Sequence, residues 1–224
     1  MNLSAFLFVL LALAQYSYNE AYPQDVEMAL KTYEAYSDHL CHEMGCVSDK
    51  ELAMAFAIVA PEVSRYDVLI DFFEVQILQR KYIADGGCDY SIGYFQMKPS
   101  FVESLEKEVT NNRRLYRKYG KRLAYGKGNA MEVRARRLER LCDAKWQITY
   151  LAVFVDVVKQ RTSGWGLKSD EEKVRCWSTL YNAGFYLNKQ RVRQRQGVKQ
   201  FPRGTKEFNY STVAVEFYKM FIGR

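Results

Sequence analysis

Apolar residues recur every three or four positions along most of the chain, which is the period of a helix that buries one face. This pattern predicts helices over the ranges 49–60, 67–84, 99–119, 129–161 (one long helix or two joined ones), 169–184 and 209–222. The range 190–204 is polar and basic, and we expect a loop there. A short hairpin fits 85–93, although no alternation of apolar and polar residues requires one. The predicted fold class is all-α or predominantly α.

Local signals mark where several of these helices begin and end. The segments 48–51 and 169–172 each place a serine three positions before a glutamate, the pair that caps a helix N-terminus reciprocally. Pro61 is expected to disrupt or end the first helix, because it has no amide hydrogen to donate. Pro99 suits the first turn of the helix that it opens. The chain has no internal repeat and no linker rich in serine and proline, so 22–224 is expected to form one domain.

The N-terminus has the pattern of an export signal. Residues Ala5 to Ala14 form an apolar run that is too short to span a bilayer but fits the core of a signal peptide. The small residues Ala12 and Ala14 predict a signal peptide over 1–14, with cleavage after Ala21 as the later alternative. A buried N-terminal helix is the competing interpretation. We therefore expect an exported protein of the periplasm or cell envelope, with no stable membrane anchor.

Five cysteines follow the predicted signal: Cys41, Cys46, Cys88, Cys142 and Cys176. In an exported protein they can form disulfides, and the odd number leaves at least one unpaired within a monomer. Cys41 and Cys46 are close enough in sequence to close a small loop. His39 and His42 lie beside them, but the spacing matches no usual zinc pattern. Disulfides or free thiols are therefore favoured over a metal site.

The chain is basic, with 33 Lys and Arg against 26 Asp and Glu, a net charge of +7 and a pI of about 9.1. The clusters 134–140 and 191–195 are rich in arginine, so nucleic-acid binding is a rival interpretation. Solvated helix faces and loops explain such clusters equally well. Export argues against nucleic acid, and the acidic polymers of a cell envelope can use the same charge. We therefore expect no nucleic-acid partner.

A first candidate for chemistry is Glu62, which directly follows Pro61 at the predicted end of an apolar helix. The negative end of the helix dipole and an apolar neighbourhood would both favour the protonated carboxyl. A general acid that works near neutral pH needs such a carboxyl. By itself, a glutamate at a helix end is more often solvated than catalytic.

Two further segments combine polar groups with glycine. In Gly93 to Pro99, the glycine lets the backbone approach a ligand closely, and Gln96 presents an amide. At the end of a predicted helix, Tyr181 and Asn182 are placed to offer hydrogen bonds to a cleft, before a glycine cap. Each segment is also compatible with ordinary packing at a helix end.

In this order, the three motifs resemble those of the lysozyme-like lytic transglycosylases, the soluble lytic transglycosylase catalytic domains. That family has a Glu at a helix end commonly followed by Ser, then Gly-Leu-Met-Gln-x-x-Pro-Ser/Thr, then Ala-Tyr-Asn-Ala-Gly. The corresponding segments here are Pro61-Glu62-Val63-Ser64, Gly93-Tyr94-Phe95-Gln96-Met97-Lys98-Pro99-Ser100 and Tyr181-Asn182-Ala183-Gly184. The resemblance covers roughly 50–221 and implies a single lysozyme-like domain with an N-terminal helical extension.

The chain departs from the family pattern in two places. Ser64 is displaced by one position, because Val63 directly follows Glu62. The interval from Glu62 to Gly93 is longer than usual, which fits an inserted helix over 67–84. This helix contains Glu74, a rival acid nearer to Gly93, although its mid-helix position suits a polar-face residue. Glu62 is the favoured catalytic residue and Glu74 the runner-up.

The resemblance implies cleavage of peptidoglycan glycan strands between N-acetylmuramic acid and N-acetylglucosamine, leaving 1,6-anhydro ends. One carboxyl group acts first as acid and then as base, and no metal or organic cofactor is implied. The implied substrate-binding residues are Gly93, Tyr94, Phe95, Gln96, Tyr181 and Asn182.

Two alternatives remain open at this point. One is a muramidase-type hydrolase on the same substrate, for which Asp71, Glu74 or Asp89 would be the second carboxylate. The other is a peptidoglycan-binding protein that does not cut. The sequence also leaves open whether a cell-envelope machine recruits the protein.

Overall fold

The structure is a computed structural model that describes residues 16–45, 47–204 and 207–223. Within these ranges every regular element is a helix, which confirms the predicted all-α fold class. The β pairing in these ranges is limited to two isolated bridges, Ile92 with Met97 and Phe201 with Phe208, so the segment 85–93 forms no hairpin of its own. The predicted signal peptide over 1–14 lies outside the described residues.

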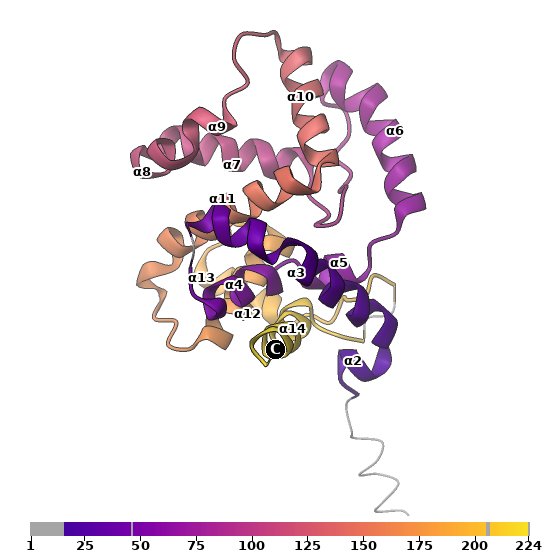
Figure 1. Ribbon diagram of the computed structural model, residues 1–224, viewed down its shortest axis with the longest axis vertical. Helices are drawn as coiled ribbons and strands as arrows, with labels where there is room; N and C mark the ends of the chain where they lie inside the picture. The colour runs from indigo at the N-terminus through magenta and orange to yellow at the C-terminus, as the bar shows by residue number, and fades with distance from the viewer. Residues whose placement is uncertain (1–15, 46, 205–206, 224) are drawn as a thin grey trace, which may run out of the picture.

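The helices follow one another through short connections (Figure 1). In chain order they are α2 (Tyr18–Ala21), α3 (Pro23–Met44), α4 (Asp49–Ala57), α5 (Ala60–Ser64), α6 (Val68–Asp85), α7 (Pro99–Asn111), α8 (Arg113–Leu115), the π-helix η1 (Tyr116–Gly120), α9 (Lys121–Leu123), α10 (Ala130–Cys142), α11 (Ala144–Thr162), the 3₁₀ helix η2 (Ser163–Trp165), α12 (Asp170–Ala183), α13 (Lys189–Gln196) and α14 (Tyr210–Ile222). No helix in the described part of the chain is both long and apolar enough to cross a membrane.

The helices form two groups (Figure 1). The elements from α6 to α10 lie together in the upper part of the view, and α2 to α5 with α12 to α14 lie below them. Helix α11 joins the groups because it packs against α7 and α10 on one side and against α3, α4 and α12 on the other. Every residue from Gln147 to Val155 of α11 is buried, so this helix is the centre of the core.

Pro61 interrupts the first predicted helix, as expected, but the proline itself lies in a second short helix that begins at Ala60. Helix α4 ends at Ala57, four residues before Pro61, because the proline cannot donate to the Ala57 carbonyl. The chain then turns at Ile58 and Val59 and re-enters a helix, α5, in which Pro61 occupies the first turn.

Two predicted helices are each divided where a polar side chain can cap a new N-terminus. The helix expected over 99–119 ends at Asn111, because the Asn112 side chain accepts hydrogen bonds from the Arg114 and Leu115 amides and starts α8. In the range 129–161, Asp143 caps α11 and separates it from α10, so two joined helices are present. The capping box at 169–172 is present as predicted.

The loop predicted over 190–204 is wrong in its first half, which forms α13. Asn188 caps this helix through a hydrogen bond from the Arg191 amide, and Val192 is buried beside α12. One buried valine and a cap thus hold an eight-residue helix whose other seven residues are polar. Sequence periodicity misses this case because a single apolar residue has no period.

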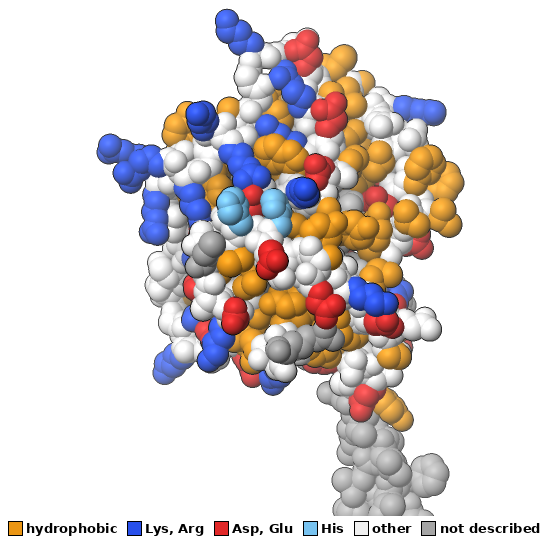
Figure 2. Space-filling view, in the orientation of Figure 1, with side chains coloured by type: hydrophobic (Ala, Val, Ile, Leu, Met, Phe, Trp, Pro, Cys, Tyr) orange, Lys and Arg blue, Asp and Glu red, His pale blue; other side chains and the backbone are white. Residues whose placement is uncertain are grey.

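The first half of α6 exposes the side chains that its sequence predicted to be an apolar face. Val68, Leu69, Ile70, Phe72 and Phe73 are each more than half exposed. Figure 2 shows hydrophobic side chains gathered at the outer edge of the molecule, where α6 lies in Figure 1. The helix is anchored by its second half, where buried side chains pack against α10.

The arginines of α10 serve the fold. Arg134 donates to the Ile83 and Ala84 carbonyls at the end of α6. Arg140 donates to the Leu123 and Ala124 carbonyls at the end of α9. Two of the four arginines over 134–140 therefore bind carbonyl groups at helix C-termini.

Three of the cysteines, Cys88, Cys142 and Cys176, are free thiols. Cys46 lies outside the described residues, so the loop closed by Cys41 and Cys46 stays a prediction. In the described part of the chain, no group of three His, Cys, Asp or Glu residues is arranged to hold a metal ion.

Candidate active site

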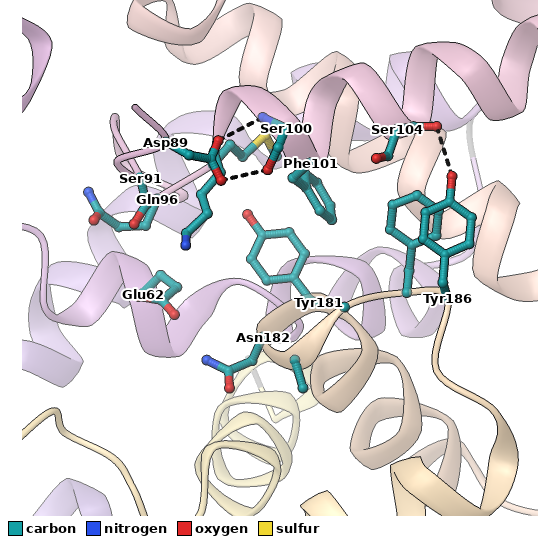
Figure 3. A pocket seen from close by; sticks show the side chains of 15 residues that line it. Glu62, Asp89, Ser91, Gln96, Ser100, Phe101, Ser104, Tyr181, Asn182 and Tyr186 are labelled. Carbon is teal, nitrogen blue, oxygen red and sulfur yellow. Dashed lines mark hydrogen bonds between the residues drawn. The ribbon is translucent and has the colours of Figure 1, made fainter. Parts of the chain in front are cut away.

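A cavity of about 430 Å³ lies where the two groups of helices meet (Figure 3). Helix α5 supplies Glu62 from one side, and the α6–α7 connection with the start of α7 supplies the opposite side. The C-terminus of α12 and the turn after it form a third side. The lining side chains that carry polar groups are Glu62, Asp89, Ser91, Gln96, Lys98, Ser100, Ser104, Tyr181, Asn182 and Tyr186.

Glu62 has the electrostatic character that its sequence context predicted. Its side chain is largely withdrawn from water, and this burial raises the pKa of Glu62 to about 7. A hydrogen bond with the Asn182 side chain acts in the opposite direction and is the smaller influence. The carboxyl therefore exchanges its proton near neutral pH, in the range that suits a group acting first as an acid and then as a base.

The cause of this pKa differs in part from the one predicted. Glu62 lies in the first turn of α5, and not at the negative end of the preceding helix. The dipole of α5 would favour the ionised carboxylate, but this helix has only five residues, so its field is weak. Burial, the other predicted cause, sets the direction of the shift.

We predict that Glu62→Gln makes the protein more stable than wild type at pH 8 but not at pH 4. Because folding raises the pKa of Glu62 from 4.5 to about 7, the native state binds the proton more tightly than the unfolded chain. Wild-type stability should therefore fall by about 3 kcal/mol as the pH rises from about 4.5 to about 7, and the variant should not show this loss.

Urea unfolding of both proteins at the two pH values measures this difference, with Glu139→Gln on the exposed surface of α10 as the matched control. If the free energies of unfolding of wild type and Glu62→Gln differ by the same amount at pH 4 and pH 8, the raised pKa of Glu62 is refuted.

The turn Gly93 to Gln96 is held in a conformation that costs energy. Gln96 has a φ of 49°, in the left-handed region that side chains other than glycine rarely adopt. Its side-chain amide donates to the Gly93 carbonyl at 3.0 Å. Strained residues of this kind cluster at functional sites, and Gln96 lines the cavity.

Two residues hold this turn: Gln147, which the sequence interpretation did not place in the site, and Asp71, which it named only as a possible second carboxylate. The fully buried Gln147 accepts a hydrogen bond from the Phe95 amide at 2.9 Å and donates to the Ile92 carbonyl at 2.7 Å. Asp71 accepts the Gly93 amide at 2.6 Å. Gly93 is required, because a Cβ atom there would lie 2.0 Å from the Gln147 amide nitrogen. The one feature of the sequence that could have pointed to Gln147 is that its amide side chain stands alone in the apolar run of α11.

Tyr181 and Asn182 lie at the cavity, as predicted. The Tyr181 hydroxyl donates to the Phe95 carbonyl at 2.5 Å and so ties α12 to the turn. Burial and the nearby Glu62 charge raise the pKa of Tyr181 well above its usual range. Tyr210 of α14, which the sequence interpretation did not assign, also feels the Glu62 charge and donates to the Ile58 carbonyl at 3.1 Å. Both phenols thus stay neutral beside the carboxyl.

Tyr94 and Phe95, two other predicted substrate-binding residues, point away from this cavity. The Phe95 side chain is 1% exposed and packs edge-on against Phe56 in the core, so only its backbone serves the site. Tyr94 is partly exposed, packs against Tyr66 and lines a separate hollow beside α3. Adjacent residues of a tight turn point in different directions, which the sequence does not specify.

Of the other candidate carboxylates, Asp71 and Asp89 have structural partners and Glu74 lies outside the cavity. Glu74 lies mid-helix in α6 and does not line the cavity. Asp71 holds the Gly93 turn and accepts the Tyr66 hydroxyl. Asp89 does line the cavity, but its two oxygens accept the Ser100 amide at 2.9 Å and the Ser100 hydroxyl at 2.6 Å (Figure 3).

Comparison with known proteins adds no relative: no family model, no curated protein and no solved structure matches this chain. The chemistry of the cavity is therefore the basis for a functional proposal.

Proposed function

We propose that this protein is a peptidoglycan lytic transglycosylase that acts in the cell envelope after export. The observation that carries the proposal is the withdrawn Glu62 carboxyl, whose pKa is raised to about 7, in a cavity where amide and hydroxyl groups outnumber the other charged side chains, Lys98 and Asp89. The amide and hydroxyl groups suit a sugar, because sugars are bound through hydrogen bonds from such groups. The order of the Glu62, Gly93 and Tyr181 motifs supports the same family of reactions.

In the first step, protonated Glu62 gives its proton to the glycosidic oxygen, and the bond from this oxygen to C1 of N-acetylmuramic acid breaks. The carboxylate then accepts the proton of the C6 hydroxyl of the same sugar. The oxygen of that hydroxyl forms a bond with C1, which closes the 1,6-anhydro ring. Glu62 ends the cycle protonated, so one carboxyl serves as acid and base with no added water.

The engagement of Asp89 favours this lyase reaction over hydrolysis. A hydrolase of the ordinary kind needs a second carboxylate to activate water or to form a covalent intermediate. Among the described lining residues, Asp89 is the other carboxylate in the cavity, and its oxygens hold the first turn of α7. An aspartate whose two oxygens both accept hydrogen bonds from Ser100 is less available to act as a base or nucleophile.

Mass spectrometry of the soluble products tests the proposal. When purified peptidoglycan sacculi are incubated with the protein, we expect fragments that end in 1,6-anhydro-N-acetylmuramic acid. Fragments with reducing ends would instead identify a hydrolase and direct attention to Asp89. Sacculi that retain the protein and release no fragments would identify a binding protein without this activity.

A further inference from the structure

A second cavity, of about 320 Å³, adjoins the candidate active site at the C-terminus of α12. Asn182 and Ala183 line both cavities, so a ligand in one lies next to a ligand in the other. We call the second cavity the Arg195 pocket. The lining residues used below are Asn182, Arg195, Gln200, Asn209, Tyr210 and Ser211.

Arg195 is the single charged side chain among the described residues of this pocket. It is exposed on α13, and its guanidinium makes no hydrogen bond or ion pair with any other described residue. The arginines of α10 differ, because Arg134 and Arg140 are bound to backbone carbonyls. Arg195 therefore offers a planar set of donors, which matches a carboxylate in charge and geometry.

The remaining polar groups of the pocket do not neutralise this charge. The side-chain oxygen of Asn209 (Oδ1) accepts the Ser211 amide at 2.9 Å and the Ser211 hydroxyl at 2.7 Å, which caps α14. The Tyr210 hydroxyl is bound to the Ile58 carbonyl. The pocket also lies at the N-terminus of α14, a helix of thirteen residues, whose dipole adds positive potential.

We propose that the Arg195 pocket binds a carboxylate of the peptidoglycan substrate while the adjoining sugar occupies the cavity of Glu62. This inference rests on the proposed function, since peptidoglycan supplies sugars and carboxylates on one polymer. The carboxylate has two possible sources, the lactyl ether of a muramic acid without peptide and the peptide stem. Gln200 also lines the pocket and carries a side-chain amide, a group that can donate to a carboxylate.

Binding to three soluble glycans tests the inference in a Glu62→Gln background, where the glycan is not consumed. The probes are glycan strands with peptide stems, strands freed of peptides by an amidase, and uncharged chitohexaose. Arg195→Gln should weaken binding of at least one carboxylate-bearing strand about tenfold. It should leave the affinity for chitohexaose unchanged, and Arg195→Lys should restore part of the loss.

Arg191→Gln is the matched control, because Arg191 lies on the same helix and lines neither cavity. Loss confined to strands with stems would identify the stem carboxylate, and loss with the bare strands would identify the lactyl carboxylate. If Arg195→Gln and Arg191→Gln bind all three glycans equally well, the inference is overturned while the proposed function stands. If the Glu62→Gln protein binds none of the glycans and the wild type releases no fragments, both are overturned.

Discussion

Glu62→Gln should lower the rate of glycan cleavage about a thousandfold while leaving binding to sacculi intact. The amide keeps the size of the side chain but can neither give a proton to the glycosidic oxygen nor accept one from the C6 hydroxyl. Release of anhydro fragments from sacculi, followed by mass spectrometry at several times, measures the effect.

Glu74→Gln is the matched control for this prediction. Glu74 lies outside the cavity, so its variant should cleave at close to the wild-type rate. The wild-type rate should fall as the pH rises above about 7, because the Glu62 carboxyl then loses the proton that it must donate. Loss of cleavage in Glu74→Gln with full activity in Glu62→Gln would move the acid to α6 and contradict our assignment.

Arg137→Met should lower the free energy of unfolding by about 3 kcal/mol, the largest loss of stability that we expect from a single change on α10. The side chain is 10% exposed and joins three helices. It donates to Tyr82 of α6 at 2.7 Å and to Glu103 and Glu106 of α7 at 2.9 and 2.7 Å. The Glu106 carboxylate, itself 14% exposed, would lose its counter-charge. Urea unfolding at pH 7 measures the change.

Two further variants separate the lost charge pairing from lost packing. The double variant Arg137→Met with Glu106→Gln should recover part of the stability, since it no longer buries an uncompensated charge. Arg193→Met, on the exposed face of α13, should change stability by less than about 0.5 kcal/mol. The opposite result would be a double variant whose loss of stability equals the sum of the losses in Arg137→Met and Glu106→Gln. The lost ion pair would then not be the cause of the instability of Arg137→Met.

The sequence was sufficient to predict a feature of the fold where the interactions that produce this feature are local. Helix boundaries at Ser48, Ser169, Asn209 and Gly184 were predicted because a cap depends on residues within one turn of the helix end. The same holds for the break before Pro61. The choice of Glu62 over Glu74 as the catalytic acid also rests on local context and on the order of the motifs, and it stays a prediction.

Prediction was less successful where one element depends on contacts from elsewhere in the chain. The apolar pattern of α6 indicated a buried face, but which part is covered depends on where α10 packs, and α10 reaches only its second half. Likewise, α13 forms because Val192 has a place beside α12. In both cases the sequence pattern shows which side chains are apolar, but it does not show which other helix packs against them.

The amino-acid sequence by itself determined that this protein is helical and that Glu62, Gln96 and Asn182 belong to the segments that carry its candidate chemistry. Only the tertiary structure decided which side chains meet. Gln147 reaches the Gly93 turn from a helix more than fifty residues away, and Asn182 comes to Glu62 from the end of α12. The raised pKa of Glu62 follows from this assembly, because desolvation depends on all the atoms packed around a carboxyl and not on its neighbours in sequence.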